Sequence, residues 1–507
     1  MSRPTRIQEE KAAEHTSQTA PQTAPQTAPR VTPEIPPGKR LEDSIEDEYD
    51  IAPSHQSSQL SLDDIHSSIE VPHAEAGFFR QWRAFAGPAL LVSVGYMDPG
   101  NWGTDLQGGA QFKYGLLWVV ALASAMAIFM QVLAARLGIV TGKDLAQACR
   151  DWYPRWTRYP NWISCEIAIG ACDLAEVLGS AVAINLLFHI PIFWAVLITG
   201  LDVLLVLILQ RFGLRTIEAV ILLMVATIAV CFFLELFVLP RTIPNFAEMG
   251  RAIITPSLAQ AGMATVAIGI IGATVMPHNL YLHSALVQTR ALRKNRADVA
   301  TAIRFNTIDS VFALGIAFFI NAAILVLAAT VFFGKTSVAV GGVTYMFNEA
   351  TDWIRVAFLT LTPLLGTVAA STLFAVALLA SGQSSTITGT LAGQVVMEGF
   401  THWHVRPWVR RLITRGLAIA PAIAVIGVRG DGSVNDLLVL SQVILALQLP
   451  FAMFPLLHFT SRRKFMGHWR SGWFLLTTGW ATAVIITAMD IYGLPGALHD
   501  VAVMFHR

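Results

Sequence analysis

The sequence predicts an all-α protein that crosses a membrane many times. Of its 507 residues, 54% are hydrophobic and 14% are charged, whereas about a quarter of the residues in soluble domains are charged. From residue 84 onward, apolar runs of about 20 residues recur, the length at which a helix crosses a bilayer. A soluble body of this size needs more polar surface, so the composition excludes a soluble enzyme. The net charge of +1 excludes a general nucleic-acid binder.

The first 83 residues differ in composition from the rest. They hold 8 basic and 14 acidic residues, a net charge of −6, with the repeat TAPQTAPQTAP (19–29) and the acidic run LEDSIEDEYD (41–50). Such a segment buries too little apolar area to offset chain entropy, and it lacks the apolar stretch of a secretory signal. We expect residues 1–83 to be a disordered cytoplasmic tail with the lead-in to the first helix, and residues 84–507 to be a membrane domain. A regulatory docking role for the tail stays open.

Eleven membrane-spanning helices are predicted in the remaining chain, separated by polar turns. They cover approximately residues 84–110, 115–138, 160–187, 190–210, 216–239, 260–288, 303–333, 359–383, 411–428, 435–458 and 471–493. The loops on the side of the tail hold 20 Lys and Arg residues, and the opposite side holds 7. Because basic residues collect on the cytoplasmic side of membrane proteins, we expect the N-terminus inside and, with an odd number of spans, the C-terminus outside.

Two of these spans contain a helix breaker near their centres. The first reads GPALLVSVGYMDPGNWGTDL (87–106), and the sixth reads AIGIIGATVMPHNLYLHSA (267–285). Proline lacks an N–H and frees carbonyls of the preceding turn, and unwound backbone persists inside a membrane only where it lines a cavity or is buried in protein. Either proline alone is also compatible with a simple structural kink.

The two breaks correspond to each other in position. Pro99 and Pro277 are 178 residues apart, and superposing them aligns Asn101 with Asn279 and Asp98 with Met276. Each break lies in the first helix of a five-helix unit, and an odd number of helices per unit inverts the second copy in the membrane. Matching interrupted helices in two inverted repeats indicate the binding site of a transporter.

The side chains at the breaks indicate the class of substrate. Asp98 is an anionic oxygen ligand, Asn101 is a neutral one, and the thioether of Met276 favours transition metals over magnesium or calcium. The freed carbonyls of Gly95 and Ala273 are further candidate ligands. A charge at the bilayer centre costs at least about 3 kcal/mol. Binding of a divalent cation would offset this cost for Asp98.

The motifs together resemble the Nramp family of proton-coupled divalent metal transporters. The resemblance rests on DPGN in the first span, MPHN in the sixth, DLAEVLGSA (173–181), ASGQSSTITGTLAGQVVMEGF (380–400) and LVLSQVILALQLPF (438–451), and it extends over residues 84–493. It implies a LeuT-like five-plus-five inverted repeat with an eleventh helix. It also implies a metal site of Asp98, Asn101, Met276 and the carbonyls of Gly95 and Ala273, joined by Gln442 in an occluded state.

Some details of this resemblance stay open. Gln448, six residues after Gln442, is an alternative contributor from the tenth span. The small residues of 380–400 fit either a gate hinge or close helix packing. The presence of Met276 favours manganese and ferrous iron as substrates, with cobalt, cadmium and zinc as further candidates.

A second set of polar residues forms a candidate proton pathway. His278 and His283 follow the sixth-span break, and histidine titrates near neutral pH, although a lone buried histidine is more often a packing residue. Glu166, Asp173 and Glu176, spaced by seven and three residues, share one face of the third span. Arg411 and Arg415 at the start of the ninth span offer matching cations, and the family resemblance implies a proton exit route along these carboxylates. A salt-bridge network that only joins helices is the alternative.

We therefore expect a proton-coupled importer of divalent transition metals that works by alternating access. A symporter of a small organic substrate and a metal-sensing receptor are the alternatives. We expect no enzymatic activity, since no nucleophile–base pair is recognised, and no cofactor, because metal ions and protons are the transported substrates. The expected partners are those ions and the lipid bilayer, without nucleic acid and with the oligomeric state open. The expected location is a bacterial cytoplasmic membrane.

Overall fold

The computed structural model describes most of the chain from residue 67 onward. The described residues are 67–72, 76–202, 204, 208–209, 212–238, 243–293, 295–340, 343–347, 353–365, 368–401, 407–430 and 434–506. The chain divides into two units, residues 1–55 and 56–507, and all described residues belong to the second. Most of the predicted disordered tail, residues 1–66, therefore lies outside the described residues.

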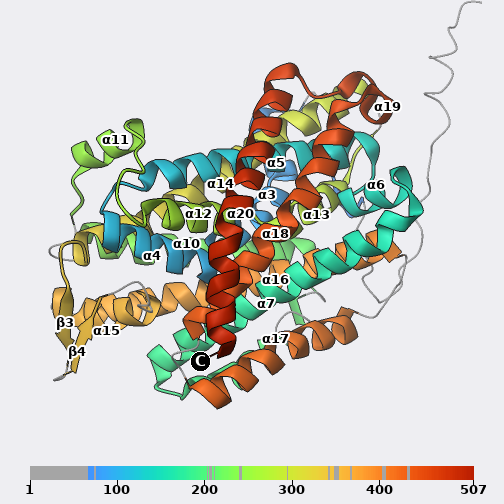
Figure 1. Ribbon diagram of the computed structural model, residues 1–507. Helices are drawn as coiled ribbons and strands as arrows, with labels where there is room; N and C mark the ends of the chain where they lie inside the picture. The colour runs from blue at the N-terminus through green and yellow to red at the C-terminus, as the bar shows by residue number, and fades with distance from the viewer. Residues whose placement is uncertain are drawn as a thin grey trace, which may run out of the picture. The chain divides into compact units, whose positions relative to one another are not determined.

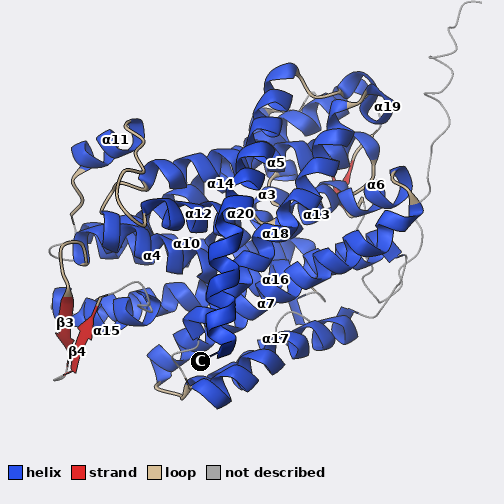
Figure 2. Cartoon of the chain, in the orientation of Figure 1, coloured by secondary structure: helices blue, strands red, loops and turns tan. Residues whose placement is uncertain are grey.

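The second unit is built almost entirely of helices (Figures 1 and 2). Its first half contains β1 (Ile69–Glu70), α2 (Phe78–Phe85), α3 (Pro88–Ser93), η1 (Val94–Met97), α4 (Pro99–Phe112), α5 (Leu117–Thr141), α6 (Leu145–Trp152), η2 (Arg155–Thr157), α7 (Arg158–Phe188), α8 (Ile192–Thr199), α10 (Leu214–Phe233), η3 (Leu234–Val238) and α11 (Phe246–Ile254). Its second half contains α12 (Met263–Thr274), α13 (Pro277–Leu286), η4 (Val287–Thr289), β2 (Arg290–Ala291), α14 (Arg296–Val331), β3 (Ser337–Val340), β4 (Val343–Met346), α15 (Trp353–Leu365), α16 (Val368–Thr401), α17 (Pro407–Arg429), α18 (Val434–Ser461), α19 (Arg463–Met466), η6 (Gly467–Trp469) and α20 (Trp473–His506).

The helices confirm a multi-pass membrane protein. Within the described residues, nine helical segments are long and apolar enough to cross a bilayer. Two of the eleven predicted spans are not among them. The first is divided into α3, η1 and α4 by its break, and only part of the fourth, including α8, is described.

The predicted eighth span, residues 359–383, is wrong in its position. The structure has α15 over Trp353–Leu365 and then α16 over Val368–Thr401, so the small-residue segment 380–400 is the second half of one continuous helix. The Gly, Ser and Thr residues of this segment are mostly buried against protein and need not be apolar. Apolar length therefore did not reveal where this helix ends. The structure therefore favours close packing over a hinge for 380–400.

The packing places α7 at the centre and α20 at the edge of the helical body. In α7 89% of the most apolar stretch is buried, and in α20 only 22%. α16 packs along α7 over much of its length, while α14 packs on α4 and α5 (Figure 1). The close approach of α7 and α16 depends on glycine, because a Cβ atom built on Gly382 would overlap the side chain of Ser180.

Local sequence signals explain several helix ends. Asp144 and Gln147 form a reciprocal capping box at the start of α6, and the side chain of Asn295 caps α14. Gly142, in the left-handed conformation with φ of 63°, ends α5.

Within the described residues, two very short sheets accompany the helices. β1 pairs with β2 in parallel, and β3 pairs with β4 as an antiparallel hairpin. The pairing of β1 fixes the segment before the first membrane helix to the connection between α13 and α14, with Ile69 opposite Arg290.

Candidate functional site

The first helix is broken at the predicted position, between η1 and α4. Asp98 has an extended backbone (φ −69°, ψ 166°) and caps α4, because its Oδ1 accepts hydrogen bonds from the backbone N (3.0 Å) and the side-chain Nδ2 (2.7 Å) of Asn101. Pro99 is the first residue of α4, where the missing N–H costs no helical hydrogen bond. The carbonyl of Met97, just before the break, accepts a hydrogen bond from Ser381 Oγ of α16 at 2.5 Å.

The sixth predicted span is broken in the same manner. α12 ends at Thr274, α13 begins at Pro277, and Met276 lies between them with an extended backbone (φ −91°, ψ 126°). Thr274 Oγ1 donates a hydrogen bond to Asn101 Oδ1 at 3.4 Å and so joins the two breaks. The fully buried side chain of Met276 packs in a small cluster with Ala168, Cys172 and Leu445.

The two breaks lie against each other and against the tenth predicted span. A Cβ atom built on Gly95 would overlap the amide of Asn279, and one built on Gly100 would overlap the amide of Gln442. Both positions therefore require glycine. Gln442 borders the first break at Gly100, two residues after Asp98.

Several polar atoms around the breaks are buried without a hydrogen bond. Among the described residues, Oδ2 of Asp98, both amide atoms of Asn279 and Oε1 of Gln442 have no partner. Buried polar atoms are normally hydrogen-bonded, so these unpaired atoms are candidate contacts for a ligand. Asp98 itself is fully buried and forms no ion pair with a described basic side chain.

This donor set suits a single cation held by one carboxylate and neutral ligands. Gly95 lies in η1 and Ala273 in the last turn of α12, each three residues before the residue at the break. The described residues contain no group of three or more His, Cys, Asp and Glu side chains arranged to hold a metal. Any cation at the breaks would therefore depend on Asp98, amide and carbonyl oxygens and the sulfur of Met276.

Asp105 is a buried carboxylate that the sequence reasoning missed. It lies on α4, seven residues and two helical turns after Asp98, with 1% of its surface exposed and no hydrogen-bond partner for Oδ2 among the described residues. Its position on the face of Asp98 follows from the helical period, which the sequence already contained.

The carboxylates of α7 meet arginines of α17, as the spacing predicted, although the pairing differs in detail. Asp173 Oδ1 lies 2.7 Å from Arg411 Nη1, and both side chains are 1% exposed. Arg415 Nη1 lies 3.9 Å from Glu176 Oε2, but its closest partner is Asp202, which the sequence analysis did not select.

Glu166 belongs to the same network at its more exposed end. Its partner is Arg410, at 2.8 Å, rather than Arg411 or Arg415. It also accepts a hydrogen bond from Trp162 Nε1 at 3.1 Å.

The two histidines of α13 contact different neighbours. His278 Nε2 lies 3.8 Å from the thiol of Cys172, and that thiol lies 3.6 Å from Glu176 Oε1. Glu176 Oε1 also accepts a hydrogen bond from Ser385 at 2.7 Å. His278 is thus connected to the α7 carboxylates through Cys172.

His283 points instead toward α5. Its Nδ1 lies 2.9 Å from Gln131 Oε1, and Gln131 donates a hydrogen bond to Tyr96 Oη at 2.6 Å. Asn321 of α14 donates to the carbonyl of Tyr96 at 2.8 Å. Among the described residues, His278 and His283 therefore contact two separate sets of neighbours.

A family profile described as natural resistance-associated macrophage protein-like matches residues 89–495. The match begins with the first broken helix and ends within α20. It therefore covers the helical body from α3 into α20 and leaves α2 outside the match.

Close relatives are named for metal transport. The chain is 49% identical over 432 residues to a protein of Nostoc sp. named Divalent metal cation transporter MntH, covering 85% of this chain and 95% of the relative. It is 47% identical over 434 residues to a protein of the same name from Listeria monocytogenes, covering 85% and 94%.

Solved structures share the fold. A variant of the manganese transporter of Eremococcus coleocola is 38% identical, with a TM-score of 0.78 over 88% of this chain and 96% of that one. Mhp1, a nucleobase-cation-symport-1 family transporter, is 13% identical with a TM-score of 0.53 over 86% and 93%, a likeness in fold alone. These similarities confirm the predicted LeuT-like architecture with broken first and sixth helices.

Proposed function

Because the chain belongs to the Nramp family, we propose that it imports divalent transition metal ions together with protons by alternating access. Manganese and ferrous iron are the favoured substrates, with cobalt, cadmium and zinc as further ones. The names of the relatives support metal cation transport, and the solved relative is a manganese transporter.

One observation supports this function most directly. A fully buried carboxylate, Asp98, lies at the first helix break without a cationic partner among the described residues. Unpaired amide oxygens of Asn279 and Gln442 border the same break, and Met276 lies at the second break. A divalent ion would neutralise Asp98 and use the unpaired oxygens, and the thioether would favour transition metals over calcium. Asp98, Asn101, Met276, Gln442 and the carbonyls of Gly95 and Ala273 are the proposed ligands.

The membrane potential is large enough to drive such import. A doubly charged ion moving inward gains about 4.6 kcal/mol at roughly 100 mV, inside negative. A co-transported proton adds to this driving force.

The proposed proton route leads from the metal site into the network of α7 and α17. Cys172 contacts both His278 and Glu176. Asp173, on the same helix, forms an ion pair with Arg411. Intramembrane carboxylates frequently belong to ion and proton pathways. His283, Glu166 and Arg415 complete the proposed set, His283 by a separate contact through Gln131.

The proposed topology places residue 67 and the basic loops in the cytoplasm and the C-terminus outside, in a bacterial cytoplasmic membrane. Residues 1–83 are proposed to be the cytoplasmic tail and lead-in, and residues 84–507 the transporter domain. The asymmetry of basic residues supports this orientation.

Reconstitution into proteoliposomes tests the function. The protein should accumulate Mn²⁺ inside the vesicles with acidification of the lumen. Asp98→Asn should slow Mn²⁺ uptake at least about 100-fold, because loss of a direct ligand costs more than loss of its supporting partner. Asp490→Asn, which removes a carboxylate from the peripheral helix α20, should leave uptake unchanged.

The alternative functions give different results in the same vesicles. A metal-sensing receptor would bind Mn²⁺ and transport none. A symporter of an organic substrate would show no Mn²⁺ uptake and no competition by Fe²⁺. Undiminished uptake by Asp98→Asn would reject Asp98 as a ligand.

A further inference from the structure

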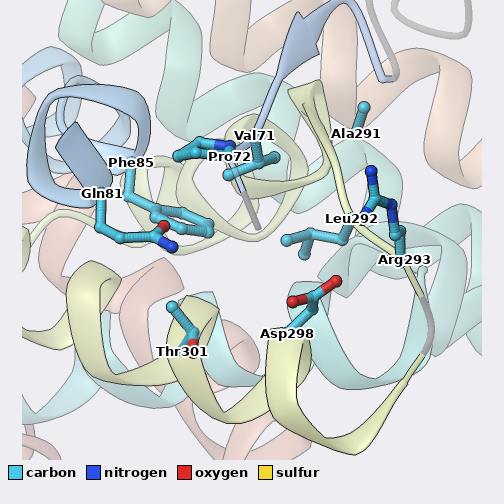
Figure 3. Close-up of a pocket in the computed structure, with 9 residues that line it drawn as sticks. All are labelled: Val71, Pro72, Gln81, Phe85, Ala291, Leu292, Arg293, Asp298 and Thr301. Atoms are coloured by element: carbon cyan, nitrogen blue, oxygen red, sulfur yellow. The ribbon is translucent and has the colours of Figure 1, made fainter. Parts of the chain in front are cut away.

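Helix α2 presents an aromatic and basic face away from the protein. Phe79 is 79% exposed, and Arg80 and Arg83 are exposed beside it. The opposite face is covered: Gln81 and Phe85 are buried and line a small pocket with Val71 and Pro72, which follow β1, and with residues of the segment 291–301 (Figure 3). α2 is thus attached on one side and free on the other.

The attached side rests on a membrane-spanning helix. Phe85 stacks on Phe305 of α14, with ring centroids 6.0 Å apart, and Trp82 meets Phe312 edge to face at 5.8 Å. Phe312 is itself 55% exposed on the apolar helix α14, where the bilayer is the expected surrounding. The exposed face of α2 therefore continues the lipid-facing surface of α14 at the edge of the membrane.

The two arginines of this face have no partner within the described part of the chain. Among the described residues, neither the Arg80 nor the Arg83 guanidinium forms a hydrogen bond or ion pair. Arg290 and Arg215, by contrast, are held by Glu218 at 3.0 and 2.8 Å. An exposed phenylalanine flanked by free arginines is typical of a helix lying in the membrane interface, with rings among acyl chains and cations at phosphate groups.

α2 is also rigidly linked to the first broken helix. Arg290 Nη2 donates to the carbonyl of Ala86 at 2.7 Å, and Arg215 Nη1 donates to the same carbonyl at 3.0 Å. Asp309 Oδ2 accepts hydrogen bonds from the backbone N of Gly87 (3.3 Å) and Ala89 (3.0 Å) at the start of α3. A displacement of α2 would therefore disturb these bonds at the start of α3, the half-helix that leads to Asp98.

We infer that α2 is a membrane-surface anchor that binds the phosphate groups of anionic phospholipids through Arg80 and Arg83, with Phe79 among the acyl chains, and that this contact sustains transport. The acidic run 41–50 of the same chain is a rival for the arginines. It is less suited to the site because a polar, acidic segment would leave Phe79 uncovered.

Photo-crosslinking tests the contact without depending on transport. Phe79→benzoylphenylalanine in the full-length protein should yield phospholipid adducts in vesicles that mix phosphatidylglycerol and phosphatidylcholine. Two juxtamembrane arginines, each worth roughly fivefold, predict a preference for the anionic lipid of roughly 25-fold. Arg80→Gln with Arg83→Gln should abolish the preference, whereas Arg155→Gln, an exposed arginine on the same side, should retain it. Adducts with the chain's own residues 1–66, or equal capture of both lipids, would overturn the inference.

Transport measurements test the consequence, which rests on the proposed function. Mn²⁺ uptake by the unmodified protein should fall at least about twofold when phosphatidylglycerol is replaced by phosphatidylcholine. This expected change in uptake is much smaller than the roughly 25-fold preference expected for lipid contact. Uptake by the double arginine variant should be equal in both, at the lower rate. Soluble glycerophosphate should not restore the higher rate. Uptake by the unmodified protein that is independent of lipid charge would refute the functional part, while absence of uptake in every lipid would refute the proposed function and leave the crosslinking result standing.

Discussion

Met276 provides the sharpest test of selectivity at the scale of single residues. The sulfur is fully buried at the sixth-helix break, and it is the soft donor of a site otherwise made of oxygen ligands. Met276→Ala should retain part of the Mn²⁺ uptake but lose discrimination against Ca²⁺, because oxygen ligands alone suit hard cations. Competition of Ca²⁺ with radioactive Mn²⁺ measures the change. Met453→Ala, a buried methionine of α18, is the control, and unaltered discrimination in Met276→Ala would contradict the role of the sulfur.

The Asp173–Arg411 pair distinguishes a proton route from a structural salt bridge. Both side chains are almost fully buried, and Asp173 Oδ1 lies 2.7 Å from Arg411 Nη1. Asp173→Asn alone should therefore destabilise the protein by about 3–5 kcal/mol, because it leaves the charge of Arg411 uncompensated. Combining it with Arg411→Gln should recover much of that stability. Thermal unfolding in detergent measures this part.

Proton flux then separates the two roles of the pair. If Asp173 transfers protons, the double variant should be stable and still transport Mn²⁺ without acidifying the vesicle lumen. Normal acidification by the stable double variant would show that the pair only joins α7 to α17.

At the residue scale, the sequence drew attention to residues beside a proline break and left Asp105, Asn279 and Cys172 unselected as site residues. Asp98 and Met276 stood out because a carboxylate and a proline break are rare inside apolar spans. Asn279 and Cys172 did not, since an amide or a thiol in a helix has many uses. Their contacts become visible only in the structure, where Gly95 lies against Asn279 and Cys172 lies between His278 and Glu176.

At the scale of elements, the junction of α2 and α3 depends on one glycine. Gly87 has φ of +131°, and a Cβ atom there would collide with the carboxyl group of Glu218. Gly87→Ala should destabilise the protein by about 1–3 kcal/mol through backbone strain and should weaken the bonds that hold α3 to α14. Gly77→Ala, at the other end of α2 with a φ of −59° and open space around it, should be neutral or slightly stabilising.

Thermal unfolding of the two glycine variants, side by side, checks this expectation. Equal midpoints for Gly87→Ala and the unmodified protein would show that the junction tolerates a side chain. The same comparison in Mn²⁺ uptake reports whether the junction matters for transport.

The elements themselves were predictable where apolar length or a breaker defined them. Both breaks were located from proline alone, since proline cannot continue the hydrogen bonding of a helix. The eighth span was misplaced because its C-terminal half faces protein, where burial does not require apolar side chains. The strands β1 and β2 are two residues each, too short for any periodicity to reveal.

At the scale of the whole molecule, the five-plus-five repeat followed from the corresponding positions of the two breaks. What the sequence did not contain was the lateral arrangement of helices. The proximity of α7 to both α16 and α17 decides which arginine meets which carboxylate, and it places Arg410 rather than Arg411 beside Glu166. Such pairings depend on contacts distant in the chain, which no local pattern records.

The orientation of the whole molecule is testable with single cysteines, because all four native cysteines are buried. Ser257, in the exposed connection between α11 and α12, and Lys464, on α19, are separated by five predicted spans and must lie on opposite sides. With the basic side in the cytoplasm, Ser257→Cys should react with a membrane-impermeant maleimide in intact cells, and Lys464→Cys only after permeabilisation. The reverse labelling pattern would place the basic loops outside the cell. Metal ions moving inward, as the membrane potential favours, would then enter the protein from the side of α19.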